Sequence, residues 1–119
     1  MAKFVRIYTG LDGLSHFESL PLPFESPVGR GTTTAEPSSG VFFNRSPAGQ
    51  DSGWHTAPRR QYVIGISGYT ELTLRDGTAE RFGPGDIILA EDITGTGHHT
   101  KVVGDEDRVS LMIPLMDDA

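Results

Sequence analysis

The segment from Gly49 to Gly68 reads GQDSGWHTAPRRQYVIGISG and decides the fold. Residues 61–66 are rich in β-branched and aromatic side chains, which is typical of a strand. Tyr62 and the alternate residues after it are apolar, and Val63 makes the opposite face apolar as well. A strand with one face in water alternates apolar and polar residues. We therefore expect this strand to be covered on both faces, by an N-terminal arm, a second sheet or a partner subunit.

Working outward, short strands separated by turn signals follow one another along the chain. Asp76-Gly77 is a strong hairpin signal, and Gly83–Asp86 is a second tight turn. Such strands recur about every 8–12 residues, the spacing of an all-β sandwich or barrel. We expect strands over residues 3–8, 41–45, 61–66, 70–75, 78–82, 87–90, 98–103 and 108–115, with a polar loop over 46–53.

The composition supports this class and excludes several others. The 119 residues include 15 Gly and 8 Pro, too many breakers for long helices. The net charge of −6 disfavours nucleic acid as a partner. No apolar run is long enough to span a membrane, and the N-terminus lacks a secretory signal, so we expect a cytoplasmic protein. Without cysteine there is no disulfide, thiolate nucleophile or Cys-ligated zinc.

The first third of the chain is the least regular part. We expect one domain overall, in which residues 1–40 are a strand, an arm and a loop that pack on the barrel or a dimer partner. Within it, residues 14–28 are predicted to be an extended arm and 29–39 a mobile loop. Residues 41–119 are predicted to form the barrel itself. If the protein dimerises, residues 3–24 are the expected covering element.

Histidines stand near two predicted strands. His55 shares strand parity with Ala57, Arg59 and Gln61, although Pro58 can break that parity. A later histidine, at position 98, follows a glycine-rich loop and opens another strand. Two histidines on different strands of a small barrel can meet inside it.

The spacing of these residues resembles the cupin family. Gly49 is followed after five residues by His55, and Gln61 and Gly68 come at the distances of the first cupin motif. Ala57 stands in place of the motif's second His, and Gln61 in place of its Glu.

The second cupin motif is matched more loosely. Gly85, Gly95 and His98 stand at its positions, while Glu91 replaces a proline and Val102 an asparagine. The stretch between Glu91 and Gly95 is two residues longer than in the pattern. The resemblance covers residues 41–115. It implies a small single-domain β-barrel, a double-stranded β-helix of jelly-roll type, which binds a small molecule inside and forms a homodimer.

The resemblance also implies a ligand set for a divalent metal. His55, Gln61 and His98 fall on metal-ligand positions of the family, and Ala57 removes the fourth ligand. Gln can ligate only through a neutral carbonyl oxygen, so this set is weaker than three His and a carboxylate. A bound metal is therefore one expectation, and a metal-free site is the other.

Two arginines next to Gln61 are further candidates. Arg59 and Arg60 are adjacent, so one is expected to face inward, where it needs a partner. That partner is either a carboxylate, Glu71, Glu91 or Asp92, or an anionic ligand held by the guanidinium.

The acidic pair Glu91-Asp92 ends a buried strand at the expected mouth of the barrel. A carboxylate there serves either as a base or ligand contact, or simply caps the turn.

Three functions remain open from the sequence. The leading one is acid–base catalysis by His55 and His98 with help from Arg59, in an isomerase, cyclase or lyase acting on a small polar or anionic molecule. The second is a metal-dependent dioxygenase or isomerase that uses iron, manganese, nickel or zinc. The third is a non-catalytic sensor or carrier, in which both histidines are structural or only bind the ligand.

Overall fold

Residues 2–116 are described by a computed structural model, in which they form ten β-strands and no helix. None of these residues belongs to a helix that is long and apolar enough to cross a membrane. The strands are β1 (Phe4–Thr9), β2 (Ser15–Ser19), β3 (Phe42–Ser46), β4 (Asp51–His55), β5 (Gln61–Ser67), β6 (Tyr69–Thr73), β7 (Ala79–Phe82), β8 (Ile87–Glu91), β9 (His98–Val103) and β10 (Arg108–Pro114).

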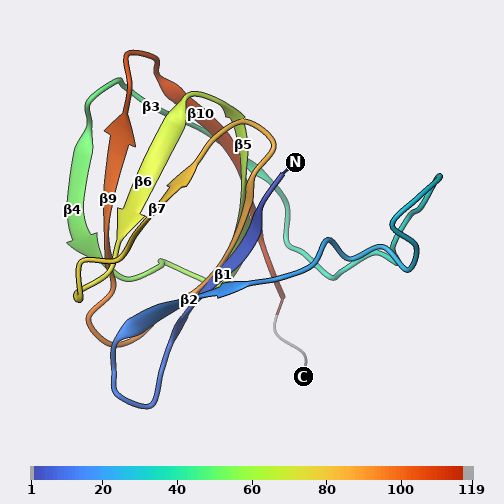
Figure 1. Cartoon of the computed structure of the whole chain (residues 1–119), viewed down its shortest axis with the longest axis horizontal. Helices are drawn as coiled ribbons and strands as arrows, with labels where there is room; N and C mark the ends of the chain where they lie inside the picture. The colour runs from blue at the N-terminus through green and yellow to red at the C-terminus, as the bar shows by residue number, and fades with distance from the viewer. Residues whose placement is uncertain (1, 117–119) are drawn as a thin grey trace.

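The strands form two sheets that face each other as the walls of a small barrel (Figure 1). One sheet has the order β2-β1-β8-β5-β10-β3, and the other has the order β4-β9-β6-β7. All pairings are antiparallel except that of β1 with β8. Apolar side chains between the sheets make the core, with Val5, Ile7, Ala57, Leu72, Leu74, Phe82, Ile88 and Ala90 buried.

Each of the eight strands predicted from the sequence is present, with ends shifted by at most a few residues. Two strands were not expected. The predicted arm over 14–28 begins as strand β2, because Ser15–Ser19 pairs with β1. The last three residues of the loop predicted over 46–53 belong to strand β4, which begins at Asp51. This strand pairs with β9 through an irregular register. Both strands are short and polar, and neither carries the apolar alternation by which the other strands are recognised.

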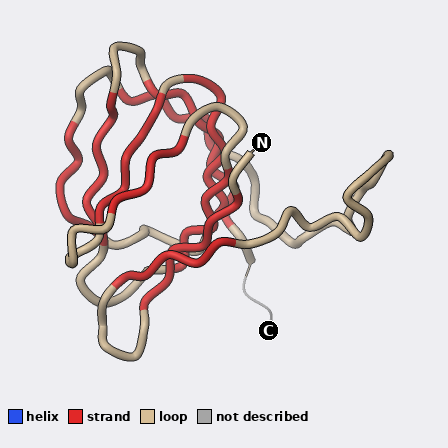
Figure 2. Tube along the Cα trace, in the orientation of Figure 1, coloured by secondary structure: helices blue, strands red, loops and turns tan. Residues whose placement is uncertain are grey.

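The connection from β2 to β3 leaves the barrel as a long excursion (Figure 2). Residues 23–40 are exposed along their whole length. The excursion returns along β10, where Ser38 bridges Leu115. Tyr62 of β5 also donates a hydrogen bond to the Glu36 carboxylate at 2.7 Å. Burial and this carboxylate raise the pKa of Tyr62 to about 12.

The outward side of the six-stranded sheet carries a surface that we call the outer apolar face. Leu111 of β10 pairs with Ile64 of β5 on one side and with Phe43 of β3 on the other, and paired residues share a face. Phe43 is 83% exposed and Ile66 is 52% exposed. The outer apolar face comprises Phe43, Ile64, Ile66, Leu111 and Ile113.

Candidate functional site

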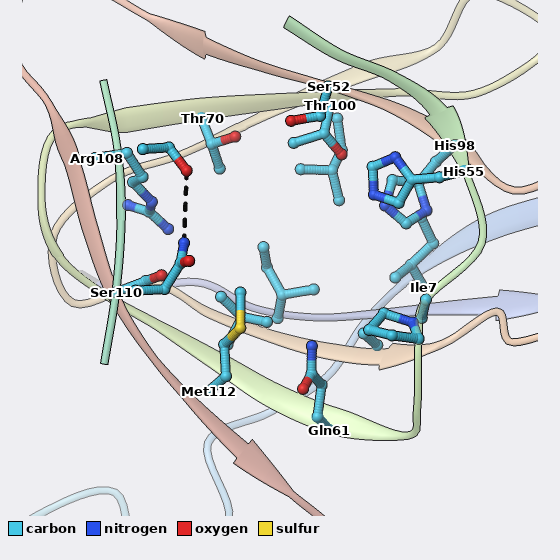
Figure 3. Close-up of a pocket in the computed structure, with 18 of the residues that line it drawn as sticks. Ile7, Ser52, His55, Gln61, Thr70, His98, Thr100, Arg108, Ser110 and Met112 are labelled. Carbon is cyan, nitrogen blue, oxygen red and sulfur yellow. Dashed lines mark hydrogen bonds between the residues drawn. The ribbon is translucent and has the colours of Figure 1, made fainter. Parts of the chain in front are cut away.

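A cavity of about 430 Å³ lies between the two sheets. Its apolar walls come from Ile7, Val63, Leu72, Ile88, Val102 and Met112, and the polar side chains of Gln50, Ser52, Gln61 and Thr100 line it as well. Its two ends are polar and differ in chemistry (Figure 3). His55 and His98 lie together at one end, and Arg108 lies at the other. The site therefore has an imidazole end and a cationic end, joined by a passage with apolar and polar walls.

His98 is held at the barrel end by a buried carboxylate. Its Nδ1 donates to Asp92 Oδ2 at 2.5 Å, and Ser15 Oγ donates to the same oxygen at 2.7 Å. Asp92 is completely buried, and His98 is 6% exposed. With Asp92 Oδ2 as the acceptor of this hydrogen bond, the proton of neutral His98 lies on Nδ1, and Nε2 carries a free lone pair.

His55 lies directly beside His98. The two residues are register partners of β4 and β9, and their ring centroids are 4.9 Å apart. Gly97 makes this approach possible, because it has a φ of 71° and a Cβ there would lie 2.2 Å from the carbonyl oxygen of His55. His55 Nδ1 lies 3.2 Å from the carbonyl oxygen of Gly53. His55 is exposed, whereas His98 is buried, so His55 stands at the mouth of the cavity.

Gln61 lines the cavity and is 3% exposed. Its Oε1 accepts a hydrogen bond from Arg59 Nη1 at 2.9 Å. Arg59 is exposed, does not line the cavity, and places its guanidinium over the Phe42 ring. The sequence suggested that Arg59 acts on the substrate directly, but the structure places it outside, as a partner of Gln61.

The expected metal ligands do not fit a divalent cation. Gln61 could ligate a metal only through its carbonyl oxygen. That oxygen already accepts a hydrogen bond from the positively charged guanidinium of Arg59. Within residues 2–116, no group of three or more His, Asp or Glu side chains is arranged to hold a metal ion. The pair His55 and His98 would have to hold a cation almost alone.

Arg60 and Glu91 form an ion pair, in which Glu91 also accepts a hydrogen bond from Arg6. None of these three side chains lines the cavity. Burial alone would raise the pKa of Glu91, but the hydrogen bonds from both arginines outweigh it and hold that pKa below its usual value. Glu91 therefore links β8 to Arg6 of β1 and to Arg60 just before β5, outside the cavity. Asp92 contacts the cavity only through His98.

Sequence reasoning did not single out Arg108 as a site residue. Arg108 and Ser110 project into the cavity from β10, while Val109 and Leu111 alternate with them. The available signal was the polar set of alternate residues, Arg108 and Ser110. Sequence reasoning missed it because the apolar set of alternate residues in a strand normally faces inward, whereas Val109 and Leu111 point away from the cavity.

No family model and no curated protein matches the sequence. Solved structures do resemble the chain. The cupin domain of Cnp3 from Schizosaccharomyces pombe is 16% identical, with 86% of this chain and 73% of that chain covered and a TM-score of 0.52. A conserved protein of unknown function from Streptococcus pyogenes is 22% identical, with 71% and 70% covered and a TM-score of 0.50.

A third structure is an uncharacterised protein from Klebsiella pneumoniae with a double-stranded β-helix domain. It is 21% identical, with 75% of this chain and 89% of that chain covered and a TM-score of 0.48. At these identities the likeness bears on the fold alone. The two sheets described above and the likeness to the first two structures confirm the predicted all-β barrel.

Proposed function

We propose that this chain, which has the cupin fold, binds a small polar molecule inside its barrel and moves a proton on it, with His98 as the general base. The observation that carries the proposal is the His98–Asp92 pair, a buried imidazole and carboxylate 2.5 Å apart at the wall of a cavity of about 430 Å³. Cavities of this size hold one small ligand.

The pair has the features that a base needs. With its proton fixed on Nδ1, His98 offers Nε2 to a ligand in the cavity. When Nε2 takes a proton, the imidazolium is stabilised by the buried negative charge of Asp92 behind it. Asp92 touches His98 and not the ligand, so it is a positioning residue. Positioned proton transfer of this kind contributes about 10²–10⁴-fold to a rate.

An isomerisation or dehydration needs such a base and a second proton carrier. His98 Nε2 takes a proton from a carbon next to a carbonyl, and the electron pair of the broken C–H bond forms an enolate. A proton then returns to a different carbon, or to a departing hydroxyl group. His55 is close enough to share this second transfer, since its ring lies 4.9 Å from that of His98 and at the mouth of the cavity.

The test follows proton transfer directly, so the reaction product need not be identified. Small ketones, hydroxy ketones and keto acids are incubated with the protein in D₂O, and exchange of their carbon-bound hydrogens is followed by NMR. We expect the native protein to accelerate exchange for at least one compound, and His98→Gln to abolish the acceleration.

His99→Gln is the matched control. His99 is the next residue, but its ring packs edge-on against Trp54 and its Nε2 lies 2.8 Å from Asp51, away from the cavity. This variant should keep the native rate. An unchanged rate in His98→Gln would refute the proposal. If the native protein binds one of these compounds but exchanges none of its hydrogens, a carrier or sensor function replaces proton transfer.

A further inference from the structure

Arg108 is a buried cation that the protein itself leaves largely unsatisfied. It is 4% exposed, and its Nη1 donates to the carbonyl oxygen of Gly68 at 3.1 Å. Its Nη2 is buried without a hydrogen-bond partner within residues 2–116. Buried charges are ordinarily paired, because removing an ion from water is costly. The open donor therefore indicates a missing acceptor.

The carboxylate whose charge acts on Arg108 is already engaged. Both oxygens of Asp86 accept backbone hydrogen bonds at 2.8 Å, one from Lys3 and one from Gly83. No ion pair joins Asp86 to Arg108 within the described residues. Burial lowers the pKa of Arg108 and the charge of Asp86 partly offsets this, but a guanidinium keeps its charge at neutral pH.

The sequence leaves room for this guanidinium. A Cβ at Gly65 would lie 2.5 Å from Nη1 of Arg108 and 3.0 Å from its Nη2. Any larger residue at position 65 would clash with the guanidinium and with the carbonyl oxygen of Gly83, which would also lie 2.5 Å from that Cβ. Thr70 and Ser110 lie at the same end of the cavity (Figure 3). Asn44 and Ser46 also line the cavity and are the register partners of Ser110 and Arg108. These groups add neutral donors around the cation.

We propose that Arg108 is an anion-binding subsite for the carboxylate of a small acid. The inference rests on the proposed function, because it sets the substrate class for the same cavity. A guanidinium offers two parallel N–H donors that match a carboxylate. Among the described residues, Arg108 is the only lysine or arginine that lines the cavity, which favours a ligand with a single negative charge at that end.

The position of Arg108 also orients the ligand. The carboxylate and the reacting carbon must lie at opposite ends of the molecule, because Arg108 and His98 lie at opposite ends of the cavity (Figure 3). Between them the walls combine apolar side chains such as Val63 and Met112 with the polar groups of Ser52, Thr100 and Gln61. The substrate class is therefore a short oxo or hydroxy acid whose carboxylate and reactive group are separated along its carbon chain.

The test titrates the protein with straight-chain monocarboxylates from acetate to hexanoate and with the matching primary amides, followed by backbone NMR shifts. We expect saturable shifts at Thr70 and Ser110 for the acids, with at least tenfold weaker binding of the amides. Arg108→Met should weaken acid binding at least tenfold. Arg81→Met is the matched control, because Arg81 is exposed on β7 of the other sheet and does not line the cavity, and it should bind like the native protein.

Each other outcome overturns the subsite. These outcomes are equal binding of acid and amide, no saturable binding by the native protein, and native-like binding by Arg108→Met. The comparison of acid with amide needs no variant, so it stands even if Arg108→Met fails to fold. If the native protein binds no acid and still accelerates deuterium exchange of neutral ketones, the subsite alone is rejected. Acid binding without exchange of any compound would reject the proposed proton transfer alone.

Discussion

Replacing Arg108 with Met should leave the ligand-free protein as stable as before or more stable. The variant loses the hydrogen bond to Gly68, which as a charge-assisted bond contributes about 1.5–3 kcal/mol. It also removes a buried charge whose Nη2 is unsatisfied, and the effective penalty for burying such an ion is several kcal/mol. Met fills much of the same space with apolar atoms. The expected net change is between about zero and 2 kcal/mol in favour of the variant.

Equilibrium unfolding in urea at one fixed protein concentration measures this change, since association would otherwise alter the apparent stability. Arg81→Met serves again as the control and should stay within about 0.5 kcal/mol of the native protein. A structural role for Arg108 predicts the opposite, because breaking a satisfied buried charge network costs about 3–5 kcal/mol. A loss of that size in Arg108→Met would refute the argument that this charge is kept for a ligand.

Three further outcomes follow from other parts of the structure. Asp92→Asn should slow deuterium exchange about 10²–10⁴-fold while acid binding stays native, because the amide favours the wrong tautomer of His98; native-like exchange in this variant would remove Asp92 from the mechanism. Glu91→Gln should lower the free energy of unfolding by about 1 kcal/mol near neutral pH, since both arginine partners are at least a third exposed. The folded state lowers the pKa of Glu91, so this stabilisation is complete above the usual value of 4.5 and is lost as the pH falls through the folded pKa. The melting temperatures of native protein and variant should therefore converge in acid. A difference in melting temperature that stays constant with pH would contradict the ion pair. We also propose a homodimer through the outer apolar face, so Ile66→Lys should convert dimer to monomer in sedimentation velocity, and a monomeric native protein would disprove it.

The sequence predicted the barrel because its signals are local. Asp76-Gly77 marks a hairpin between β6 and β7, and residues 61–66 carry the β-branched and aromatic side chains of β5. β2 and β4 escaped prediction because they are short and polar, and the partner of β4 lies far along the chain.

The candidate site was only partly predictable for a related reason. The motif spacing drew attention to His55 and His98, which the structure brings together, and to Gln61, which lines the same cavity. Whether Arg59, Arg60 or Arg108 faces inward depends on the local register and on which side of the sheet holds the cavity, and adjacent residues do not reveal this. For Asp92 the sequence leaves a base, a ligand contact and a turn cap open. Its contact with His98 Nδ1 is visible only in the folded structure.

A crystal structure of the protein with the tightest-binding straight-chain acid would test the central claim most directly. The account predicts one acid inside the barrel, with its carboxylate against the guanidinium of Arg108 and its chain directed toward Nε2 of His98. An acid bound with its carboxylate at His98, or bound outside the barrel beside Arg60, would contradict it.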